Sequence, residues 1–304
     1  MTHPQTSVTA PAPIRHAMTV DVEDYYHVSA FANVIKPSQW SEWPTTVERN
    51  TRRLLDLFDE KQIKATFFVL GWVAERYTDL IRDIAARGHE IASHGYSHQL
   101  VYRQTPQEFR SETARSKQLL EDIVQEPVIG YRAASYSITR DSLWALDILG
   151  ELGFVWDSSI FPVYHDRYGI PDSPTAPYLA AVSGGRTLLE FPLTTAAVMG
   201  YRMPAAGGGY FRLYPYALSR GLFKRATANG TTPAIFYLHP WEIDPDQPRV
   251  PGASLLSRFR HYNNLDRCLS RLQALIDEFP FGTVSDSLRS YDLTNSKPVQ
   301  LAAA

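Results

Sequence analysis

The sequence has little cysteine, no long apolar run and almost no excess charge, and each shortage excludes a class of protein. Cys268 is the single cysteine among 304 residues, which excludes an intrachain disulfide and a site built from several thiolates. The longest apolar run, around residues 66–74, is too short to cross a bilayer. A net charge of −2 gives no reason to expect nucleic acid as a partner. We therefore expect a reduced, cytoplasmic protein without a membrane span.

Nucleotide-binding motifs are also lacking, because neither a GxGxxG nor a P-loop pattern follows the first predicted strand. Short β-rich runs instead alternate with helical patterns. The predicted strands cover 18–22, 65–70, 90–93, 128–131, 154–156, 187–191, 234–238 and 281–284. The predicted helices cover 46–60, 74–87, 106–124, 139–152, 216–228 and 265–279. This alternation predicts an α/β fold with a parallel sheet, and the number of strands favours a distorted (β/α) barrel of about seven to eight strands.

The composition divides the chain into one domain with two flanking segments. Residues 1–16 are rich in Thr, Pro and Ala and lack the apolar stretch of a signal peptide, so we expect a disordered lead-in. The barrel should cover 17–290, followed by a tail at 291–304. Within it, 157–215 is dense in Pro, Gly and Tyr and has only one clear strand, which predicts an irregular insertion that forms a wall of the site.

Ionisable side chains gather at the predicted carboxyl ends of the strands. Residues 21–24 end the first strand, His94 and His98 follow the third, Arg132 ends the fourth, Asp157 the fifth and His239 the seventh. In parallel α/β barrels the active site is built at this end of the strands. The shared position therefore predicts one active site made from several distant segments.

The two histidines His94 and His98 are four residues apart, with Gly95 allowing a tight turn between them. Such a pair also occurs on surfaces and in cores. Two imidazoles and one carboxylate, with positions left open, are typical of a catalytic divalent-metal site. This donor set suits Zn²⁺ best and also Co²⁺, Ni²⁺, Fe²⁺ and Mn²⁺.

The acidic cluster at the end of the first strand offers more than one carboxylate. Asp21 and Glu23 are two apart and share a face of the strand, whereas Asp24 begins the loop. We favour Asp21 as general base and Glu23 as metal ligand. If the chain already bends at Glu23, Asp24 would reach the ion instead, so both remain candidate ligands. A helix-capping role is the alternative for the cluster.

Five short motifs carry a family resemblance. They are Thr19-Val20-Asp21-Val22-Glu23-Asp24, Ser93-His94-Gly95-Tyr96-Ser97-His98, Arg132-Ala133-Ala134-Ser135, Val155-Trp156-Asp157-Ser158-Ser159 and Tyr237-Leu238-His239. Together they resemble the polysaccharide deacetylases of the NodB-homology group, carbohydrate esterase family 4, from about residue 17 to 286. The variant motifs resemble the subgroup linked to bacterial exopolysaccharide and exosortase (PEP-CTERM) loci. The family usually has Asp-Asp in the first motif and Arg-x-Pro-Tyr in the third, and this chain departs from both, with its aromatic residue at Tyr136.

The resemblance implies a role for each candidate residue. Asp21 would be the general base, His239 the general acid, Arg132 the residue that holds the base, and Asp157 the partner of that arginine; His94 and His98 would bind the metal with Glu23 or Asp24. The implied substrate contacts are a backbone N–H near Ser135, the aromatic ring of Tyr136 and the acetyl-methyl pocket at Leu238. Trp241 is not explained by the family chemistry, and we expect its ring to shape the sugar cleft.

The implied function is metal-dependent removal of N-acetyl groups from N-acetylhexosamine units of a bacterial exopolysaccharide or its precursor. One alternative is an amidohydrolase or deformylase that acts on a small amide, such as a formyl-amino sugar or a ureide. The other is a non-catalytic carbohydrate-binding protein on the same scaffold, suggested by the altered third motif. The intact residues Asp21, His94, His98, Arg132 and His239 argue against this last alternative.

Overall fold

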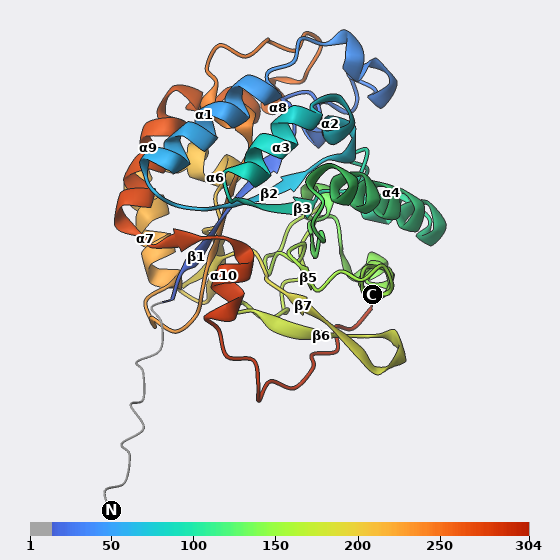
Figure 1. Ribbon diagram of the computed structural model, residues 1–304. Coiled ribbons are helices and arrows are strands. Elements are labelled where there is room, and N and C mark those ends of the chain that lie inside the picture. The colour runs from blue at the N-terminus through green and yellow to red at the C-terminus, as the bar shows by residue number, and fades with distance from the viewer. Residues whose placement is uncertain (1–13, 304) are drawn as a thin grey trace, which may run out of the picture.

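Most strands form one sheet that curls into a distorted barrel with helices on its outside (Figure 1). The computed structural model describes residues 14–303. The strand order is β10-β1-β2-β3-β4-β5-β7-β6, and β11 also pairs with β1. Neighbours from β10 to β7 are parallel, and β6 pairs with β7 in the antiparallel direction. The α/β class, the parallel sheet and the distorted barrel are thus confirmed.

The strands of the sheet are short. They are β1 (His16–Val22), β2 (Thr66–Val69), β3 (Glu90–Ser93), β4 (Gly130–Tyr131), β5 (Trp156–Asp157), β6 (Tyr178–Val182), β7 (Arg186–Glu190), β10 (Ile235–Leu238) and β11 (Phe281–Gly282). A separate hairpin consists of β8 (Thr195–Val198) and β9 (Tyr201–Pro204). Each of the eight predicted strands overlaps a strand of the structure.

The helices follow the predicted order, with additions in the second half of the chain. They are α1 (Val47–Glu60), α2 (Gly71–Arg76), α3 (Thr78–Ala86), α4 (Pro106–Val124), α5 (Trp144–Glu151), α6 (Gly208–Leu213), α7 (Tyr216–Ala226), α8 (Leu255–Tyr262), α9 (Leu265–Glu278) and α10 (Val284–Arg289). Among the short 3-10 helices are η1 (Ser29–Phe31), η4 (Ala134–Tyr136) and η7 (Pro240–Ile243). The helix expected at 74–87 is two helices, α2 and α3, that meet at Tyr77.

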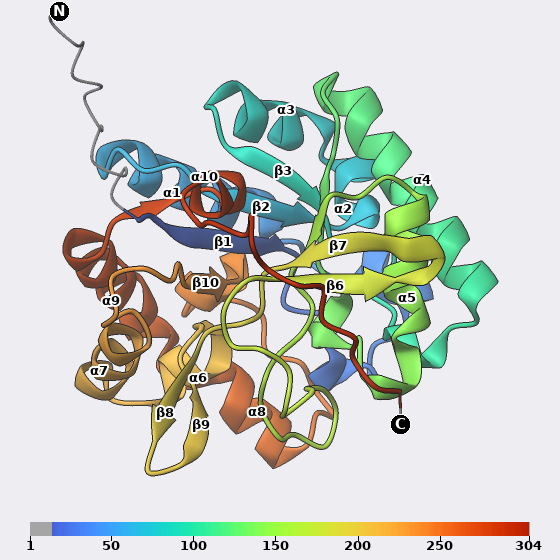
Figure 2. The ribbon, with the colours of Figure 1, turned by 90° about the horizontal axis from the view of Figure 1, so that it is seen from below.

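The segment 157–215 is more regular than we expected from its composition. It contributes β6 and β7 to the main sheet and forms the hairpin β8–β9, which packs against α7 (Figure 2). The strand β6 alternates between buried and half-buried positions, as an edge strand does. Its side chains are mostly small or aromatic, and the Gly-rich turn at 183–185 conceals the pairing in the sequence. The expectation of a single strand in this segment was wrong.

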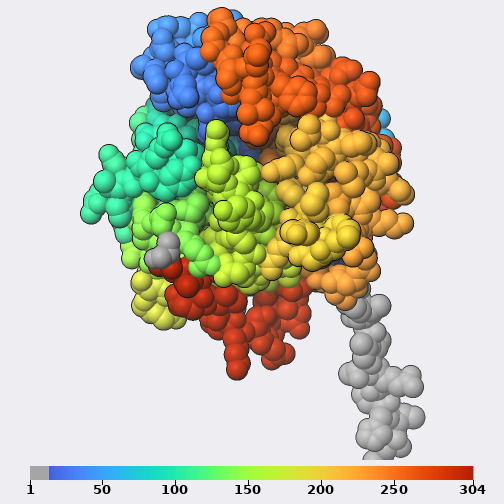
Figure 3. Space-filling model, turned by 180° about the vertical axis from the view of Figure 1, so that it is seen from behind, coloured from blue at the N-terminus to red at the C-terminus, as the bar shows by residue number. Residues whose placement is uncertain are grey.

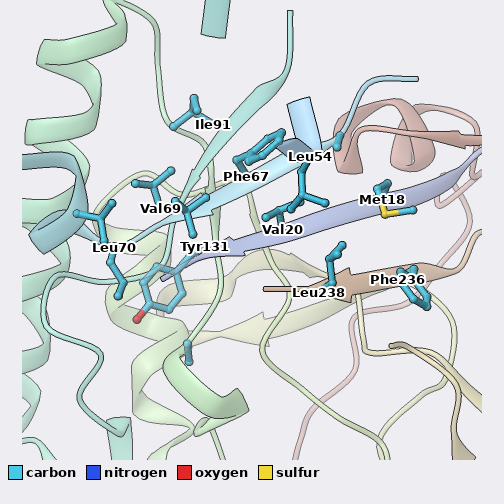
Figure 4. Close-up of a cluster of buried hydrophobic side chains, with 14 of the residues drawn as sticks. Met18, Val20, Leu54, Phe67, Val69, Leu70, Ile91, Tyr131, Phe236 and Leu238 are labelled. Atoms are coloured by element: carbon cyan, nitrogen blue, oxygen red, sulfur yellow. The ribbon is translucent and has the colours of Figure 1, made fainter. Parts of the chain in front are cut away.

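Alternate residues of the strands pack on opposite faces of the sheet. On β1, Met18 and Val20 join the core between sheet and helices, together with side chains of β2 and β10 (Figure 4). The intervening residues Ala17, Thr19 and Asp21 point to the other face, because strand side chains alternate. This period of two directs the polar end of β1 into the interior of the barrel.

The segment that follows β7 contacts β10, which lies at one edge of the sheet. Thr194 Oγ1 donates a hydrogen bond to the Ile235 carbonyl at 2.8 Å and accepts one from the Ile235 N–H at 2.7 Å. Gly207 then pairs with Tyr237 of β10. A Cβ at Gly207, whose φ is 115°, would lie 2.1 Å from the Tyr237 carbonyl oxygen. Any larger residue would clash with β10, so this position requires glycine.

The chain ends differ in what the structure describes. The lead-in predicted for 1–16 lies mostly outside the described residues, and β1 already begins at His16. The tail runs along β6, where Val299 exchanges hydrogen bonds with Leu179 and Ala181 at 2.7 and 2.9 Å. Across residues 14–303, none of the helices combines the length and apolar character needed to cross a membrane.

Candidate metal centre and catalytic site

Three predicted metal ligands converge at the carboxyl ends of β1 and β3. Glu23, His94 and His98 each offer one donor atom, and these atoms all lie within 4.8 Å of one another. Glu23 directly follows β1, and both histidines lie in the turn after β3. The structure thus brings together the two-histidine, one-carboxylate set that the sequence suggested.

A hydrogen bond of His94 leaves one of its ring nitrogens free for a cation. His94 Nδ1 lies 2.8 Å from the Arg132 carbonyl oxygen, which can only accept, so Nδ1 carries the proton. Burial lowers the pKa of His94 to about 4, so the ring is neutral near pH 7. A neutral imidazole whose Nδ1–H is bound by a carbonyl presents Nε2 as a metal donor.

The Glu23 carboxylate is also suited to bind a cation. Its Oε2 lies 2.9 Å from His98 Nε2, but the two atoms are not aligned as a hydrogen bond. This buried oxygen therefore has no hydrogen-bond partner among residues 14–303. Burial alone would raise the pKa of Glu23, but His98, His239 and His94 together hold it well below its usual range. An anionic oxygen without a partner, next to imidazole nitrogens, fits a divalent cation.

Arg132 holds the carboxylate of Asp21 inside the barrel. Its Nη1 donates to Asp21 Oδ1 at 2.7 Å and to Thr19 Oγ1 at 2.9 Å, and the guanidinium stacks 3.9 Å from the ring centre of Phe68. The other side of the guanidinium donates to the Ser158 carbonyl at 3.2 Å and to Ser158 Oγ at 3.1 Å. Asp21 is therefore fixed beside the metal ligands, with Oδ2 on the side of His239.

His239 faces the acidic residues from the end of β10. Its Nε2 lies 3.4 Å from Glu23 Oε1 and 3.9 Å from Asp21 Oδ2. Its Nδ1 lies 3.0 Å from Glu242 Oε2. Burial alone would lower the pKa of His239, but the carboxylates of Glu242, Glu23 and Asp21 raise it to about 9. The ring is consequently held in its protonated form near pH 7.

The sequence indicates no catalytic role for Glu242, but in the structure this residue anchors His239. Glu242 Oε2 also accepts the His239 backbone N–H at 2.9 Å, while Oε1 accepts from Arg212 Nε at 2.6 Å. Arg212 and Glu242 are both buried, and Arg212 with His239 holds the pKa of Glu242 down to about 2 against the effect of burial. The spacing of His239 and Glu242 is that of a capping box, a pattern that indicates a helix start rather than a catalytic pair.

Asp24 lies away from the three donors, which corrects its place as a candidate metal ligand. The chain does bend at Glu23, whose N–H donates to the Asp21 carbonyl at 2.9 Å. Asp24 nevertheless turns to the start of α1, where its carboxylate accepts from the N–H groups of Thr46 and Val47 at 2.7 and 3.0 Å. The hydroxyls of Thr45 and Thr46 also donate to it, at 2.8 and 2.7 Å. Its oxygens thus accept hydrogen bonds at a helix N-terminus, which is the helix-capping role named as the alternative for the cluster.

Asp157 does not contact Arg132 as we expected. It lies opposite Glu190 of the neighbouring strand β7, and both side chains are fully buried. Asp157 Oδ1 accepts from Ser159 Oγ at 2.6 Å, and Glu190 Oε1 accepts the Ile160 N–H at 2.9 Å. Burial raises the pKa of both carboxyl groups, and the nearby charge of Asp157 raises that of Glu190 further. The pair thus holds the loop that follows β5 through Ser159 and Ile160. Ser158 of the same loop contacts Arg132.

The predicted substrate contacts after Arg132 lie in an unusual turn. Ser135 and Tyr136 both have left-handed backbone, with φ of 51° and 55°. Ser135 Oγ shares a hydrogen bond of 2.8 Å with Ser29 Oγ. The Tyr136 ring is buried and lies 5.1 Å from that of Tyr237. Two such residues in succession are strained, and this strain is typical of functional sites.

The predicted contacts next to His239 are both buried. Leu238 lies within β10 and belongs to the main hydrophobic core. Trp241 stacks on His239, with ring centres 5.0 Å apart, and on His261, with ring centres 4.1 Å apart. Trp241 is 5% exposed. Its faces are therefore occupied by the two histidine rings, which corrects its expected place as a sugar-stacking surface.

The space-filling view shows a recess where the blue, orange and yellow-green surfaces meet (Figure 3). These colours correspond to the segments after β1, around α8 and after β5. The segment that follows β5 thus forms part of the wall of this recess.

Comparison with known proteins divides the chain into two matched segments. The family model for polysaccharide deacetylase matches residues 40–154, and that for a domain of unknown function (DUF3473) matches residues 158–289. The first segment contains His94, His98 and Arg132, and the second contains Arg212, His239 and Glu242. Residues 40–154 of the chain thus belong to the polysaccharide deacetylase family.

Relatives with assigned names match parts of this chain. It is 34% identical over 70 residues to a peptidoglycan-N-acetylglucosamine deacetylase of Bacillus cereus, covering 23% of this chain and 26% of the relative. It is 29% identical over 140 residues to a chitooligosaccharide deacetylase of a Bradyrhizobium species, covering 46% of this chain and 63% of the relative. The matches therefore span less than two thirds of either relative.

A solved structure supports the fold over the whole chain. It is a crystal structure of a proposed polysaccharide deacetylase from Mycobacterium smegmatis, which superposes with a TM-score of 0.66 at 20% identity and covers 99% of both chains. At this identity the likeness concerns the fold alone.

The position of Asp24 gives a first prediction. Asp24→Asn should lower the free energy of unfolding by about 2 kcal/mol or more, because an amide cannot accept all the hydrogen bonds at the start of α1. It should leave zinc binding unchanged. Urea denaturation and metal analysis would measure the two effects, with the exposed Asp246→Asn as the matched control. Loss of the metal at unchanged stability would instead restore Asp24 as a ligand.

The Asp157–Glu190 pair gives a second prediction, on pH dependence. Because the pKa of Glu190 is raised in the folded protein, the free energy of unfolding should fall as pH rises from about 4.3, the usual value, through the raised one. In the variant Glu190→Gln the free energy of unfolding should not fall in this pH range, because the glutamine amide can donate a hydrogen bond to Asp157 at any pH. The stability of the variant relative to the unmodified protein should therefore increase between about pH 5 and pH 8.

Urea denaturation at both pH values would measure that increase. The control variant Glu126→Gln changes an exposed residue. Its free energy of unfolding relative to the unmodified protein should be the same at both pH values, because it removes a carboxylate from the surface. A constant difference for Glu190→Gln as well would show that the buried pair does not hold a proton.

Proposed function

We propose that this chain is a metal-dependent de-N-acetylase that acts on N-acetylhexosamine units of a bacterial polysaccharide or its precursor. The observation that carries the proposal is the convergence of the Glu23, His94 and His98 donors between Asp21 on one side and His239 on the other. A hydrolase of amides needs a proton acceptor for water and a proton donor for the amine. Both types of group adjoin the same donor cluster.

The residues of the chain then divide the chemistry. Asp21, held by Arg132 at 2.7 Å, accepts the proton of the attacking water. His239, protonated near pH 7, donates a proton to the departing amine, which could not leave as an anion. The backbone of the strained turn at Ser135 offers an N–H to the developing oxyanion.

Glu23, His94 and His98 would hold the cation, and Zn²⁺ suits two imidazoles and one carboxylate best. When bound, a divalent cation supplies Lewis-acid activation of the amide carbonyl and of water. Arg132 orients one of these ligands, because its backbone carbonyl oxygen lies 2.8 Å from His94 Nδ1 and fixes the ring.

The substrate class is supported by the names of the relatives, one called a peptidoglycan-N-acetylglucosamine deacetylase and the other a chitooligosaccharide deacetylase. An exopolysaccharide or its lipid-linked precursor remains our proposal within that class, on the basis of the variant first and third motifs. Acetate release from chitooligosaccharides and from N-acetylated exopolysaccharide tests it. Hydrolysis of ureides or formyl-amino sugars alone would favour the small-amide alternative.

The general-base assignment gives a third prediction. Asp21→Asn should lower kcat for acetate release by at least about 100-fold, because an amide cannot accept the proton of water. Zinc content should stay close to that of the unmodified protein, since the three donors are unchanged. Acetate release and metal analysis would be measured on the same preparation, with Asp246→Asn as the control. Full activity of Asp21→Asn would end the assignment.

The contact between Glu242 and His239 gives a fourth prediction. Glu242→Gln removes a carboxylate that raises the pKa of His239, so protonated His239 should disappear at a lower pH. The alkaline limb of the kcat profile should move to lower pH, and kcat at pH 7–8 should fall by about tenfold or more at similar KM.

Glu242→Asp keeps the charge on a shorter side chain and should retain a more alkaline limb than Glu242→Gln. A loss of kcat with an unmoved alkaline limb would mean that Glu242 only supports the fold.

A further inference from the structure

The helix α8 leaves three large apolar side chains uncovered. Leu255 is 83% exposed, and Leu256 and Phe259 are each 57% exposed. Monomeric proteins usually cover such side chains when they stand together on one helix. The helix lies in the segment matched by the domain of unknown function, and the proposed chemistry does not use it.

The exposure of α8 is not the result of a loose attachment. Its buried residue His261 stacks on Trp241 and shares a hydrogen bond of 2.7 Å with Gln247 Oε1 through Nε2. Arg212 donates to the carbonyls of Arg260 and His261 at the end of the helix, at 3.2 and 2.8 Å. The underside of α8 is therefore fixed by buried groups, and its apolar face is held outward.

Cations without acidic partners lie on α8 and in the segments next to it. Arg249, Arg258 and Arg260 are exposed. Lys36 is exposed as well and lies in the segment after η1, and η1 packs against α8. None of the four forms an ion pair with a residue of the described part of the chain. Residues 25–41 and 247–265 contain no Asp or Glu, although the whole chain has a net charge of −2. We call these four cations, with Leu255, Leu256 and Phe259, the α8 surface.

The α8 surface lies beside the candidate site. His261 at its base contacts Trp241, and Trp241 contacts His239, through stacked rings. In the space-filling view, the orange segment that includes α8 stands on the rim of the recess (Figure 3). Whatever covers this surface will therefore come close to the entrance of the site.

We propose that the α8 surface docks on an anionic lipid bilayer. Protruding Leu and Phe side chains can enter the boundary between headgroups and acyl chains, while arginine and lysine pair with anionic headgroups. A second copy of the chain suits the surface less well, because a two-fold contact would place these cations against one another. A free anionic glycan would leave the apolar side chains in water.

Docking would turn the rim of the site toward the membrane. This step rests on the proposed function: a saccharide carried by a membrane lipid could then reach the recess without leaving the bilayer. Lipid binding itself needs no substrate, so it can be tested separately from the hydrolytic activity.

The test is sedimentation of the full chain with vesicles of phosphatidylcholine alone or mixed with phosphatidylglycerol. The protein should bind the mixed vesicles, and binding should weaken as salt is raised from about 0.05 to 0.5 M. The variant Leu255→Ser/Leu256→Ser/Phe259→Ser should bind at least about tenfold more weakly. The matched control is Val155→Ser/Leu218→Ser, which removes side chains that are 56% and 44% exposed elsewhere and should bind like the unmodified protein.

Two results would overturn the proposal. One is absence of binding to the mixed vesicles, or equal binding by the triple variant. The other is a dimer in light scattering that the triple variant converts to a monomer, since a second copy would then cover α8. Acetate release from soluble chitooligosaccharides should be unchanged in the triple variant. Vesicle binding by a protein that releases no acetate would contradict the proposed function and leave the lipid surface intact.

Discussion

The buried guanidinium of Arg132 is the contact on which the candidate site depends. It joins the first, fourth and fifth strands, through Thr19 and Asp21 on one side and Ser158 on the other. Its carbonyl also fixes His94. Burying an arginine is costly unless every N–H group has a partner, so these hydrogen bonds must form together. The ion pair therefore fixes the position of the predicted base and the orientation of a predicted ligand at once.

A second buried arginine fixes the side chains on the His239 side of the site. Arg212 binds Glu242, which binds His239, and it also closes the end of α8. The two arginines lie in different matched segments, Arg132 in the deacetylase segment and Arg212 in the segment of unknown function. The second segment thus supplies the partner of the proposed acid and the surface beside it. This arrangement explains why both segments are needed to build one site.

Much of this site could be predicted because strand ends are local features. Alternation of apolar runs placed His94, Arg132 and His239 at the carboxyl ends of strands, and a parallel barrel brings those ends together. The partners of Asp24 and Asp157 could not be predicted in this way. Asp24 is satisfied by a helix that starts some twenty residues later, and Asp157 lies opposite Glu190 of a neighbouring strand in a segment that resembled a loop. Such pairings depend on register between distant segments, which composition does not encode.

The sequence by itself determined the fold class, the order of the elements, the family and the set of candidate donors, because period and motif spacing are properties of short segments. Only the tertiary structure decided which carboxylate joins the histidines, because Glu23 and Asp24 differ in direction rather than in chemistry. It also decided that Glu242 anchors His239 and that Trp241 stands behind that ring. Finally, it revealed the exposed face of α8, since exposure depends on what the rest of the fold leaves uncovered.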